Sequence, residues 1–272
     1  MPEIALPHGT VHYREHGDGR PVVFVHGALV DGRLWEPVAD RLTGLRRVVP
    51  DLPLGSHRTP MRPGADLGPA GLARLIADFL DALDLRDVVL VGNDTGGALC
   101  QLVVTRHPER VGRLVLTNCD AFDNFPPKAF RSLVLASRVH LLTAAVQPLR
   151  LPALRRLPIA YGWLSKRPLP AELLDAWVRP FLADAGIRRD ARRVFAGVDR
   201  GLLLDTAARL REFERPVLIA WAPEDPFFPL DHARRLAAIF PDARVVEVPD
   251  AHAFVSRDQP ERLAALIQEF AA

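Results

Sequence analysis

The chain has 272 residues, of which 49% are apolar, and a formal net charge of +2. This length can bury one large core or two modest ones, and the sequence shows neither repeats nor low-complexity tracts. The near-neutral charge gives no electrostatic reason to expect nucleic acid as a partner. The first residues lack the basic start and apolar run of a secretion signal, and the most apolar stretch, Leu133 to Leu149, is interrupted by Arg138, His140 and Pro148. We therefore expect a cytoplasmic, globular protein with no membrane partner.

Three smaller sets of residues carry no predicted chemistry. The cysteines Cys100 and Cys119 are expected to be small buried residues in a reducing compartment. The histidines are spread along the chain without ligand spacing, so neither a metal nor another cofactor is expected. A loose basic cluster is expected to be a solvated face rather than a binding patch, and it consists of Arg150, Arg155, Arg156, Lys166 and Arg167.

Short β-branched segments alternate with helical patterns along most of the chain, which is typical of an α/β protein with a mostly parallel sheet covered by helices. An edge hairpin is predicted over Ile4 to Arg14, with a turn at Gly9. The further strands are predicted at Val22–His26, Arg47–Pro50, Val88–Val91, Leu114–Thr117, Val217–Trp221 and Val245–Val248. Helices are predicted, from apolar residues at helical spacing, at Arg33–Leu42, Ala70–Leu83, Gly97–His107, Asp231–Phe240 and Pro260–Phe270.

The alternation is broken between residues 121 and 210. No convincing strand lies there, and prolines such as Pro126, Pro148 and Pro180 divide the stretch into helical segments. An excursion of this size from a compact domain usually serves function. We therefore predict a helical lid over residues 121–210, inserted between two parts of one core domain, residues 1–120 and 211–272.

The most informative motif is the run from Val88 to Leu99, VVLVGNDTGGAL, in which a buried strand turns on small residues into a helix. The flanking glycines allow a strained turn whose apex side chain, Asp94, projects above the sheet. The unpaired amides and the dipole of the helix N-terminus should lower the pKa of Asp94, so that its carboxylate stays ionised and ready for nucleophilic attack. The alternative is that Asp94 or Thr95 only caps the helix.

Three further features fall at the same edge of the predicted sheet. The first strand after the hairpin ends in a His-Gly turn, so the amide of Ala28 can lie beside the amide of Thr95 as an oxyanion hole. Asp225 follows the next-to-last strand, and His252 follows the last strand. Ligands bind at the carboxyl edge of open α/β sheets, so we expect these groups to meet there.

The order of nucleophile, acid and histidine, together with the His-Gly turn, resembles the α/β-hydrolase fold family over essentially the whole chain, lid included. Most members carry serine at the apex of the turn, whereas the aspartate found here is similar to the branch that contains haloalkane dehalogenases and epoxide hydrolases. The resemblance implies Asp94 as nucleophile, Asp225 as triad acid, His252 as triad base, and the amides of Ala28 and Thr95 as oxyanion donors. Asp120, just after another strand, is the alternative acid.

A carboxylate nucleophile suits substrates that can be attacked at saturated carbon. It would form an anhydride with an ester carbonyl, but it can displace a leaving group from an alkyl carbon and leave an ordinary ester. Water activated by His252 would then hydrolyse this ester, while Asp225 holds the imidazole tautomer and the oxyanion hole stabilises the intermediate. A small-molecule substrate and water are the only partners expected, and the oligomeric state stays open.

The residue after the nucleophile differs from the residue that two groups of similar enzymes carry at this position. Haloalkane dehalogenases usually carry tryptophan there as a halide donor, and fluoroacetate-type enzymes carry arginine, whereas this chain has Thr95. An indole donor could come instead from Trp35, Trp163 or Trp177. The halide site is therefore incomplete in the sequence.

Epoxide hydrolases use lid phenols to protonate the opening alkoxide, usually as a pair. Tyr161 and His140 both lie in the predicted lid and could supply such a pair, which tips the balance slightly toward epoxides. The possible substrate contacts in the lid are therefore His140, Tyr161 and Trp163. Two other classes stay open: hydrolysis of an ester, lactone or carbon–carbon bond by direct water attack, and a lidded ligand receptor without turnover.

Overall fold

An eight-stranded sheet forms the centre of the molecule. The computed structural model describes residues 1–272, and its sheet has the strand order β1-β2-β4-β3-β5-β6-β7-β8. β1 and β2 form an antiparallel hairpin, β2 pairs antiparallel with β4, and every other neighbouring pair is parallel. The predicted α/β class with its edge hairpin is confirmed. The strands are β1 (Glu3–Leu6), β2 (Gly9–His16), β3 (Arg20–Val25), β4 (Leu45–Asp51), β5 (Val88–Asp94), β6 (Val111–Cys119), β7 (Val217–Trp221) and β8 (Ala243–Glu247).

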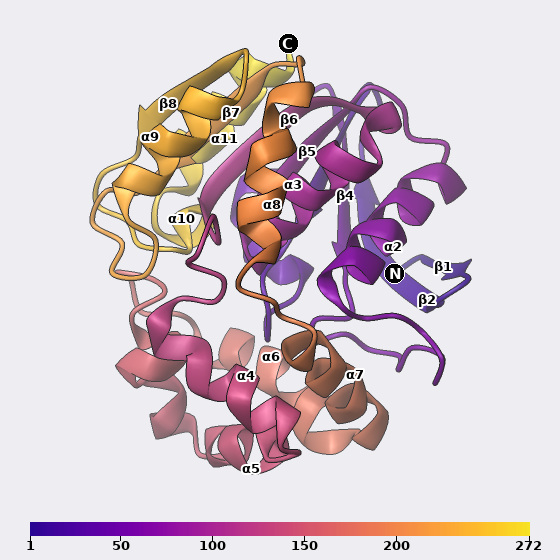
Figure 1. Cartoon of the computed structure of the whole chain (residues 1–272), viewed down its shortest axis with the longest axis vertical. Coiled ribbons are helices and arrows are strands. Elements are labelled where there is room, and N and C mark those ends of the chain that lie inside the picture. Colours follow the sequence, from indigo (N-terminus) through magenta and orange to yellow (C-terminus); the bar gives the residue numbers. More distant parts are fainter.

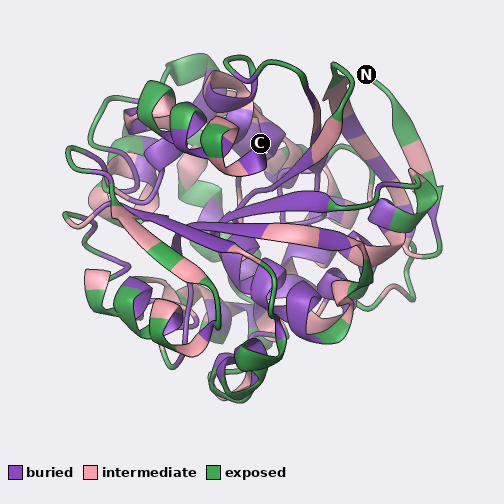
Figure 2. Cartoon of the chain, turned by 90° about the horizontal axis from the view of Figure 1, so that it is seen from above, coloured by how far each residue is buried: buried purple, intermediate pink, exposed green.

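Helices cover both faces of the sheet. α2, α3, α8 and α9 follow one another on one face, and α1 and α11 pack together on the opposite face. Figure 2 shows the buried strands between these two layers. Burial on both faces explains why the inner strands are continuous apolar runs. The core helices and turns are η1 (Gly32–Trp35), α1 (Glu36–Ala39), α2 (Pro69–Ala82), α3 (Thr95–Arg106), η2 (Pro108–Arg110), α8 (Leu202–Arg209), η7 (Leu210–Glu212), α9 (Leu230–Ile239), α10 (Val255–Asp258) and α11 (Pro260–Ala271).

The chain between β6 and β7 contains no strand. Most of it forms a cap of short helices, which lies together at one end of the molecule (Figure 1). We call residues 121–201 the lid, because α8 packs against α3 on the sheet and buries Leu203 and Ala207 there. The predicted insert of 121–210 thus includes one core helix. The lid consists of η3 (Lys128–Phe130), α4 (Arg131–Arg138), α5 (Leu142–Val146), η4 (Gln147–Arg150), η5 (Pro152–Arg156), η6 (Pro158–Gly162), α6 (Ala171–Ala183) and α7 (Ala185–Ala196).

The lid is packed tightly onto the core. One continuous apolar cluster of 86 buried residues runs from the sheet into the lid and includes Trp177 of α6. The indole Nε1 of Trp177 donates to Asp31 Oδ1 at 3.0 Å, and the hydroxyl of Ser56 donates to the Trp177 carbonyl oxygen at 2.8 Å. His57 Nε2 lies 3.3 Å from Asp190 Oδ2 of α7, with both side chains buried. These contacts fix the lid above the carboxyl edge of the sheet.

Two further features of the chain are the state of its cysteines and the lengths of its helices. Cys100 and Cys119 are both free and buried, as predicted. None of the helices combines the length and the apolar character that crossing a membrane would require.

Candidate active site

The chain reverses from strand to helix at Asp94 itself, since β5 ends there and α3 begins at the next residue. Asp94 has a φ of +54°, a left-handed conformation that costs a non-glycine residue energy. Small neighbours make the turn possible. A Cβ atom on Gly92 would lie 2.8 Å from Gly97 Cα, and one on Gly97 would lie 2.3 Å from Cys119 Cβ. The result is a carboxyl group that lines the cavity beneath the lid.

The carboxyl group of Asp94 rests against the turn that follows β3. A Cβ atom on Gly27 would lie 2.1 Å from Asp94 Oδ2, so glycine is what leaves room for this side chain. The backbone amides of Thr95 and Ala28 lie close enough to the carboxylate to lower its pKa and so favour its ionised form. These are the two amides that the sequence predicts as an oxyanion hole.

Burial outweighs these amides in setting the charge of Asp94. Its pKa is raised to about 7, chiefly because the surrounding protein removes water from the charged form. The side chain keeps an intermediate exposure only because it faces the cavity. The expectation of a lowered pKa that keeps Asp94 ionised is therefore wrong, because the amide at the helix N-terminus does lower the pKa but burial raises it by more.

A second carboxyl group lies beside Asp94 in the same cavity. β5 and β6 pair so that Asp94 is opposite Cys119, and Asp120 is the next residue after β6. Asp120 is buried, its Oδ1 has no hydrogen-bond partner, and the Thr95 side chain lies close enough to the carboxyl group to lower its pKa slightly. Burial, and then the neighbouring Asp94, raise the pKa of Asp120 well above its usual range. This shift favours the protonated form of Asp120, since two neighbouring buried carboxyl groups are not both readily ionised.

Asp225 lies in the loop after β7 with both carboxyl oxygens engaged. Oδ1 accepts from the amides of Phe227 at 2.8 Å and Phe228 at 3.3 Å, and Oδ2 accepts from Asn118 Nδ2 at 2.8 Å. Burial raises the pKa of Asp225 to about 7. Asn118 also makes two hydrogen bonds to the backbone of Ala222, at 3.0 and 2.7 Å, and so fastens this loop to β6. Asn118 is not among the site residues predicted from the sequence, where its one signal is an amide in an apolar strand.

His252 follows β8, and its imidazole faces the lid. Its Nδ1 lies 3.0 Å from the carbonyl oxygen of Trp163, and its backbone amide donates to Asp258 Oδ2 at 3.0 Å. No hydrogen bond joins His252 to Asp225, and His252 is not among the residues that line the cavity at Asp94. The structure therefore leaves the imidazole outside the cluster of groups around Asp94.

A cavity of about 460 Å³ lies between Asp94 and the lid. Asp94 and Asp120 are the only carboxyl groups on its surface, and no lysine, arginine, histidine or tryptophan lines it. Tyr161 does line it, but its hydroxyl donates to the carbonyl oxygen of Leu29 at 2.7 Å. The remaining surface is mostly apolar and comes largely from lid residues such as Phe130, Leu133, Leu149, Leu154 and Leu164.

The other expected lid contacts lie outside this cavity. Trp163 is 52% exposed and His140 is also exposed, in a turn with a φ of +63°. His140 therefore does not pair with Tyr161 over a substrate, and the expectation of contacts from His140 and Trp163 differs from what the structure shows. The other two indoles point elsewhere, since Trp177 bonds to a core aspartate and Trp35 packs on a core phenylalanine. No indole N–H thus faces the cavity.

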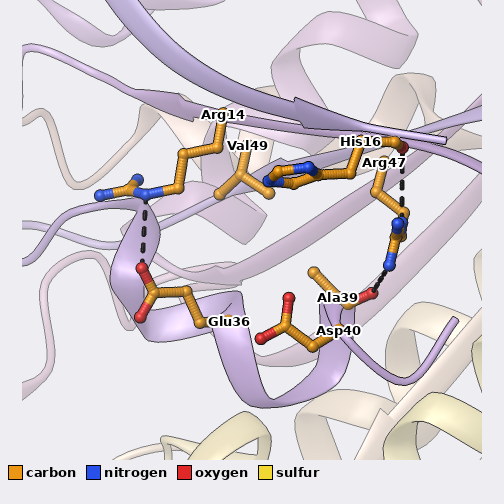
Figure 3. A pocket seen from close by; sticks show the side chains of 7 residues that line it. All are labelled: Arg14, His16, Glu36, Ala39, Asp40, Arg47 and Val49. Atoms are coloured by element: carbon orange, nitrogen blue, oxygen red, sulfur yellow. Dashed lines mark hydrogen bonds and ion pairs between the residues drawn. The ribbon is translucent and has the colours of Figure 1, made fainter. Parts of the chain in front are cut away.

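A second hollow, of about 240 Å³, lies along β2, β4 and α1. Figure 3 shows three of its charged side chains engaged with their surroundings: Arg14 pairs with Glu36 at 3.3 Å, and Arg47 donates to the carbonyl oxygen of Ala39 at 3.0 Å. It shares no lining residue with the cavity at Asp94 and holds no side chain at a strained turn. We therefore place the candidate active site at Asp94.

Comparison with known proteins gives the family. The model of the α/β hydrolase fold matches residues 20–258. Haloalkane dehalogenase 2 of Mycobacterium bovis is 30% identical over 279 residues, which cover 96% of this chain and 91% of that protein. A cis-3-alkyl-4-alkyloxetan-2-one decarboxylase of Shewanella oneidensis is 27% identical over 96% of this chain and 84% of its own length. An ancestral haloalkane dehalogenase has a similar structure, with a TM-score of 0.81 at 20% identity, over 100% of this chain and 98% of that one.

The family match spans most of the chain and includes Asp94, Asp120 and Asp225. Enzymes named as dehalogenases occur among the sequence relatives and among the structural neighbours. These relatives favour an enzyme over the ligand receptor that the sequence left open. The chain belongs to the α/β-hydrolase family and is a hydrolase.

Proposed function

We propose that this hydrolase forms an ester between Asp94 and the alkyl part of an apolar substrate, and then hydrolyses that ester with water. The observation that carries the proposal is the position of Asp94, a carboxyl group at the apex of a strained turn that faces an apolar cavity. A carboxylate attacks saturated carbon without needing a base to activate it. The relative that is named a haloalkane dehalogenase supports an alkyl substrate.

The polar groups that are absent from the cavity surface limit which substrates it can bind. Because no cationic side chain lines it, a carboxylate on the substrate would be buried without a partner. No indole N–H lines the cavity, and Thr95 stands where haloalkane dehalogenases usually carry a tryptophan. A departing halide would therefore find no indole donor. A strained ring ether needs one proton on its oxygen instead, and Asp120 is a carboxyl group in the same cavity whose raised pKa favours the protonated form. We therefore favour an epoxide with apolar substituents, with an alkyl halide as the alternative.

In the first step a carboxylate oxygen of Asp94 attacks a ring carbon of the epoxide. The carbon–oxygen bond of the ring breaks, and the freed oxygen takes the proton of Asp120. The products of this step are a hydroxyalkyl ester on Asp94 and a carboxylate on Asp120. General acid catalysis of this kind contributes about 10²–10⁴-fold in typical enzymes.

In the second step water attacks the carbonyl carbon of the ester, while the two oxyanion amides stabilise the developing negative charge. A base must take a proton from this water and return it to the leaving oxygen. The tetrahedral intermediate collapses, the bond between the Asp94 carbonyl carbon and the alkyl oxygen breaks, and the diol leaves. Asp94, released as the acid, then passes its proton to Asp120, so that both groups regain their starting charge. His252 is the proposed base, oriented by Asp225, once its ring has turned from the Trp163 carbonyl toward the cavity. The carboxylate that the first step leaves on Asp120 is the alternative base, already present in the cavity.

The test of the proposal is capture of the ester. Wild-type protein and the His252→Gln variant are incubated with panels of apolar epoxides and haloalkanes, weighed intact and then digested. We expect a mass increase on the peptide that contains Asp94, which accumulates in His252→Gln if His252 is the base. Asp94→Asn is the matched control and should give no adduct. Wild-type turnover by Asp94→Asn would contradict the proposal.

One relative favours a second candidate substrate. The protein of Shewanella oneidensis is named for an alkyl-substituted oxetan-2-one, which is a strained four-membered lactone. The apolar lid walls suit the alkyl substituents of such a ring, which this hydrolase could open through Asp94 or by direct attack of water. A single turnover in labelled water separates the two routes, because the route through the ester transfers an unlabelled Asp94 oxygen to the first product.

A further inference from the structure

One stretch of the lid contains basic residues but no acidic ones. Residues 124–171 contain eight lysines and arginines and no aspartate or glutamate, although the whole chain has 33 acidic residues. We call this stretch the cationic lid segment. Half of its basic residues are exposed and make no ion pair with the rest of the protein, and these are Lys128, Arg138, Arg150 and Arg156. Their charge is therefore left for a partner outside the chain.

The same segment carries most of the exposed apolar side chains of the protein. Seven of the nine large apolar side chains that are exposed belong to it, although it is a minor part of the chain. Leu135 is 64% exposed and Ile159 is 73% exposed. Water-exposed apolar groups concentrated in this way mark a surface that another phase or molecule covers. The seven side chains are Leu135, Val139, Leu141, Leu151, Leu157, Ile159 and Trp163.

The cavity above Asp94 opens through this segment. Leu157 and Ile159 line the cavity and are also 43% and 73% exposed, so they lie at its mouth. The other exposed residues that line the cavity are Ala129, Ser132, Ala145 and Pro148, all uncharged and all from the lid. A substrate that enters here passes over apolar side chains all the way to the active site.

We propose that the cationic lid segment docks on an anionic lipid surface, so that a lipophilic substrate passes from the bilayer directly into the cavity. Apolar side chains among unpaired arginines are the combination that holds proteins at a lipid interface, because the former enter the acyl region and the latter meet phosphate groups. The lid forms one end of the molecule, where it can approach a flat surface (Figure 1). A second copy of the chain fits less well, because two acid-free surfaces would repel each other in a symmetric contact.

The nature of the delivered substrate rests on the proposed function, whereas the docking itself does not depend on the chemistry of Asp94. The proposal also differs from simple adsorption of an apolar patch, because part of the binding comes from attraction between basic residues and anionic headgroups, which salt weakens. Binding should require anionic headgroups and should weaken as ionic strength rises. The basic cluster of the lid, expected from the sequence to be a solvated face, would then be part of a binding surface.

The experiment is sedimentation of the whole protein with phosphatidylcholine vesicles that contain or lack phosphatidylglycerol. We expect binding to the anionic vesicles only. The double variant Arg150→Glu/Arg156→Glu should bind them about tenfold more weakly or worse, since each basic residue adds to the attraction. Arg211→Glu, at an exposed and unpaired arginine of the core, is the matched charge control and should bind like wild type.

A second pair of variants tests the apolar part. Leu135→Ser should weaken binding to anionic vesicles, while Leu204→Ser, at an exposed leucine of α8 outside the lid, should not. Turnover of a water-soluble substrate should be unchanged in these variants, because none of the altered residues lines the cavity. Asp94→Asn should bind vesicles like wild type, so a failure of the covalent mechanism would not be mistaken for a failure of docking.

Three results would overturn the proposal. One is absence of vesicle binding by the wild-type protein. Another is equal loss of binding in the lid variants and their matched core controls. The third is self-association or binding to an acidic protein that Leu135→Ser abolishes while vesicles remain unbound, since the surface would then serve a protein partner.

Discussion

At the scale of single residues, the chemistry of Asp94 is set by two opposing effects on its carboxyl group. The amides of Thr95 and Ala28 favour the charged form, and burial favours the neutral form. Burial dominates, and the pKa rises to about 7. Burial also raises the pKa of Asp120. Less opposes it there, because Oδ1 has no hydrogen-bond partner and the neighbouring Asp94 raises the pKa further. The pair therefore favours one proton shared between two carboxyl groups, which is the charge state that attack by Asp94 with proton donation by Asp120 requires.

This pairing predicts how ester formation responds to pH. Only ionised Asp94 attacks carbon, so the single-turnover rate of adduct formation should rise about tenfold for each pH unit below 7 and level off above it. Burial and the neighbouring Asp94 raise the pKa of Asp120 well above its usual range, which favours the proton donor that the first step needs. Rapid quenching followed by intact-protein mass spectrometry measures the rate. A rate that is flat across this range, in protein shown by circular dichroism to remain folded, would disagree with a nucleophile that titrates near neutrality.

A second prediction at this scale concerns the leaving group. Asp120→Asn removes the proton donor but keeps the shape of the side chain, so opening of an epoxide should fall about 10²-fold or more. Adduct formation with an alkyl iodide should fall much less, since iodide leaves without a proton. The ratio of the two rates, measured in both proteins, is the readout. An equal fall for both substrates would mean that Asp120 only shapes the site.

At the scale of elements, the position of the nucleophile depends on how closely three segments approach one another. The end of β5, the start of α3 and the turn after β3 meet at distances that only glycines allow, as at Gly97 and Gly27. The strain at Asp94 is held by this packing, because the residues on both sides belong to regular elements that cannot move independently. A small change in the turn after β3 should therefore reach the chemistry directly.

Gly27→Ala tests this coupling. The new Cβ atom would lie 2.1 Å from Asp94 Oδ2, so the carboxyl group must leave the amides that position it. We expect ester formation to fall about 10²–10³-fold and stability to fall by about 1–3 kcal/mol. Gly64→Ala is the matched control, because a Cβ atom there meets nothing within 4 Å, and it should change neither quantity. Adduct yield and urea unfolding measure the two effects, and unaltered adduct yield in Gly27→Ala would show that the carboxyl group needs no such support.

The elements also show what the sequence can and cannot predict. The strands and the apex residue follow from local patterns, because β-branched runs and glycines near Asp94 restrict the backbone whatever surrounds them. The orientation of His252 does not follow, since its imidazole meets the carbonyl oxygen of Trp163 in the lid, 89 residues away along the chain. The sign of the pKa shift at Asp94 escapes prediction for the same reason: it depends on burial beneath the lid, which a strand-turn-helix motif does not contain.

At the scale of the whole molecule, the lid turns an open sheet edge into a buried site, and the protein loses stability by doing so. Three carboxyl groups, on Asp94, Asp120 and Asp225, have raised pKa values in the folded state because they are buried. In the unfolded chain such groups have pKa values of about 3.9. The folded state therefore binds more protons than the unfolded state between pH 4 and 7, and these groups stabilise it less as the pH rises through that range.

The contribution of Asp94 to this dependence can be measured by removing its charge. Asp94→Asn should be more stable than wild type at pH 8 by about 1–3 kcal/mol, less than its full pKa shift implies because cavity water stabilises the ion. The gain should shrink as the pH falls toward 4, where both the folded and the unfolded carboxyl groups become neutral. Asp225→Asn is the contrasting variant: it disturbs three hydrogen bonds and should be less stable than wild type at both pH values. Urea unfolding at several pH values gives both differences. A gain for Asp94→Asn that stays constant from pH 4 to 8 would mean that relief of backbone strain, and not loss of a buried charge, is its source.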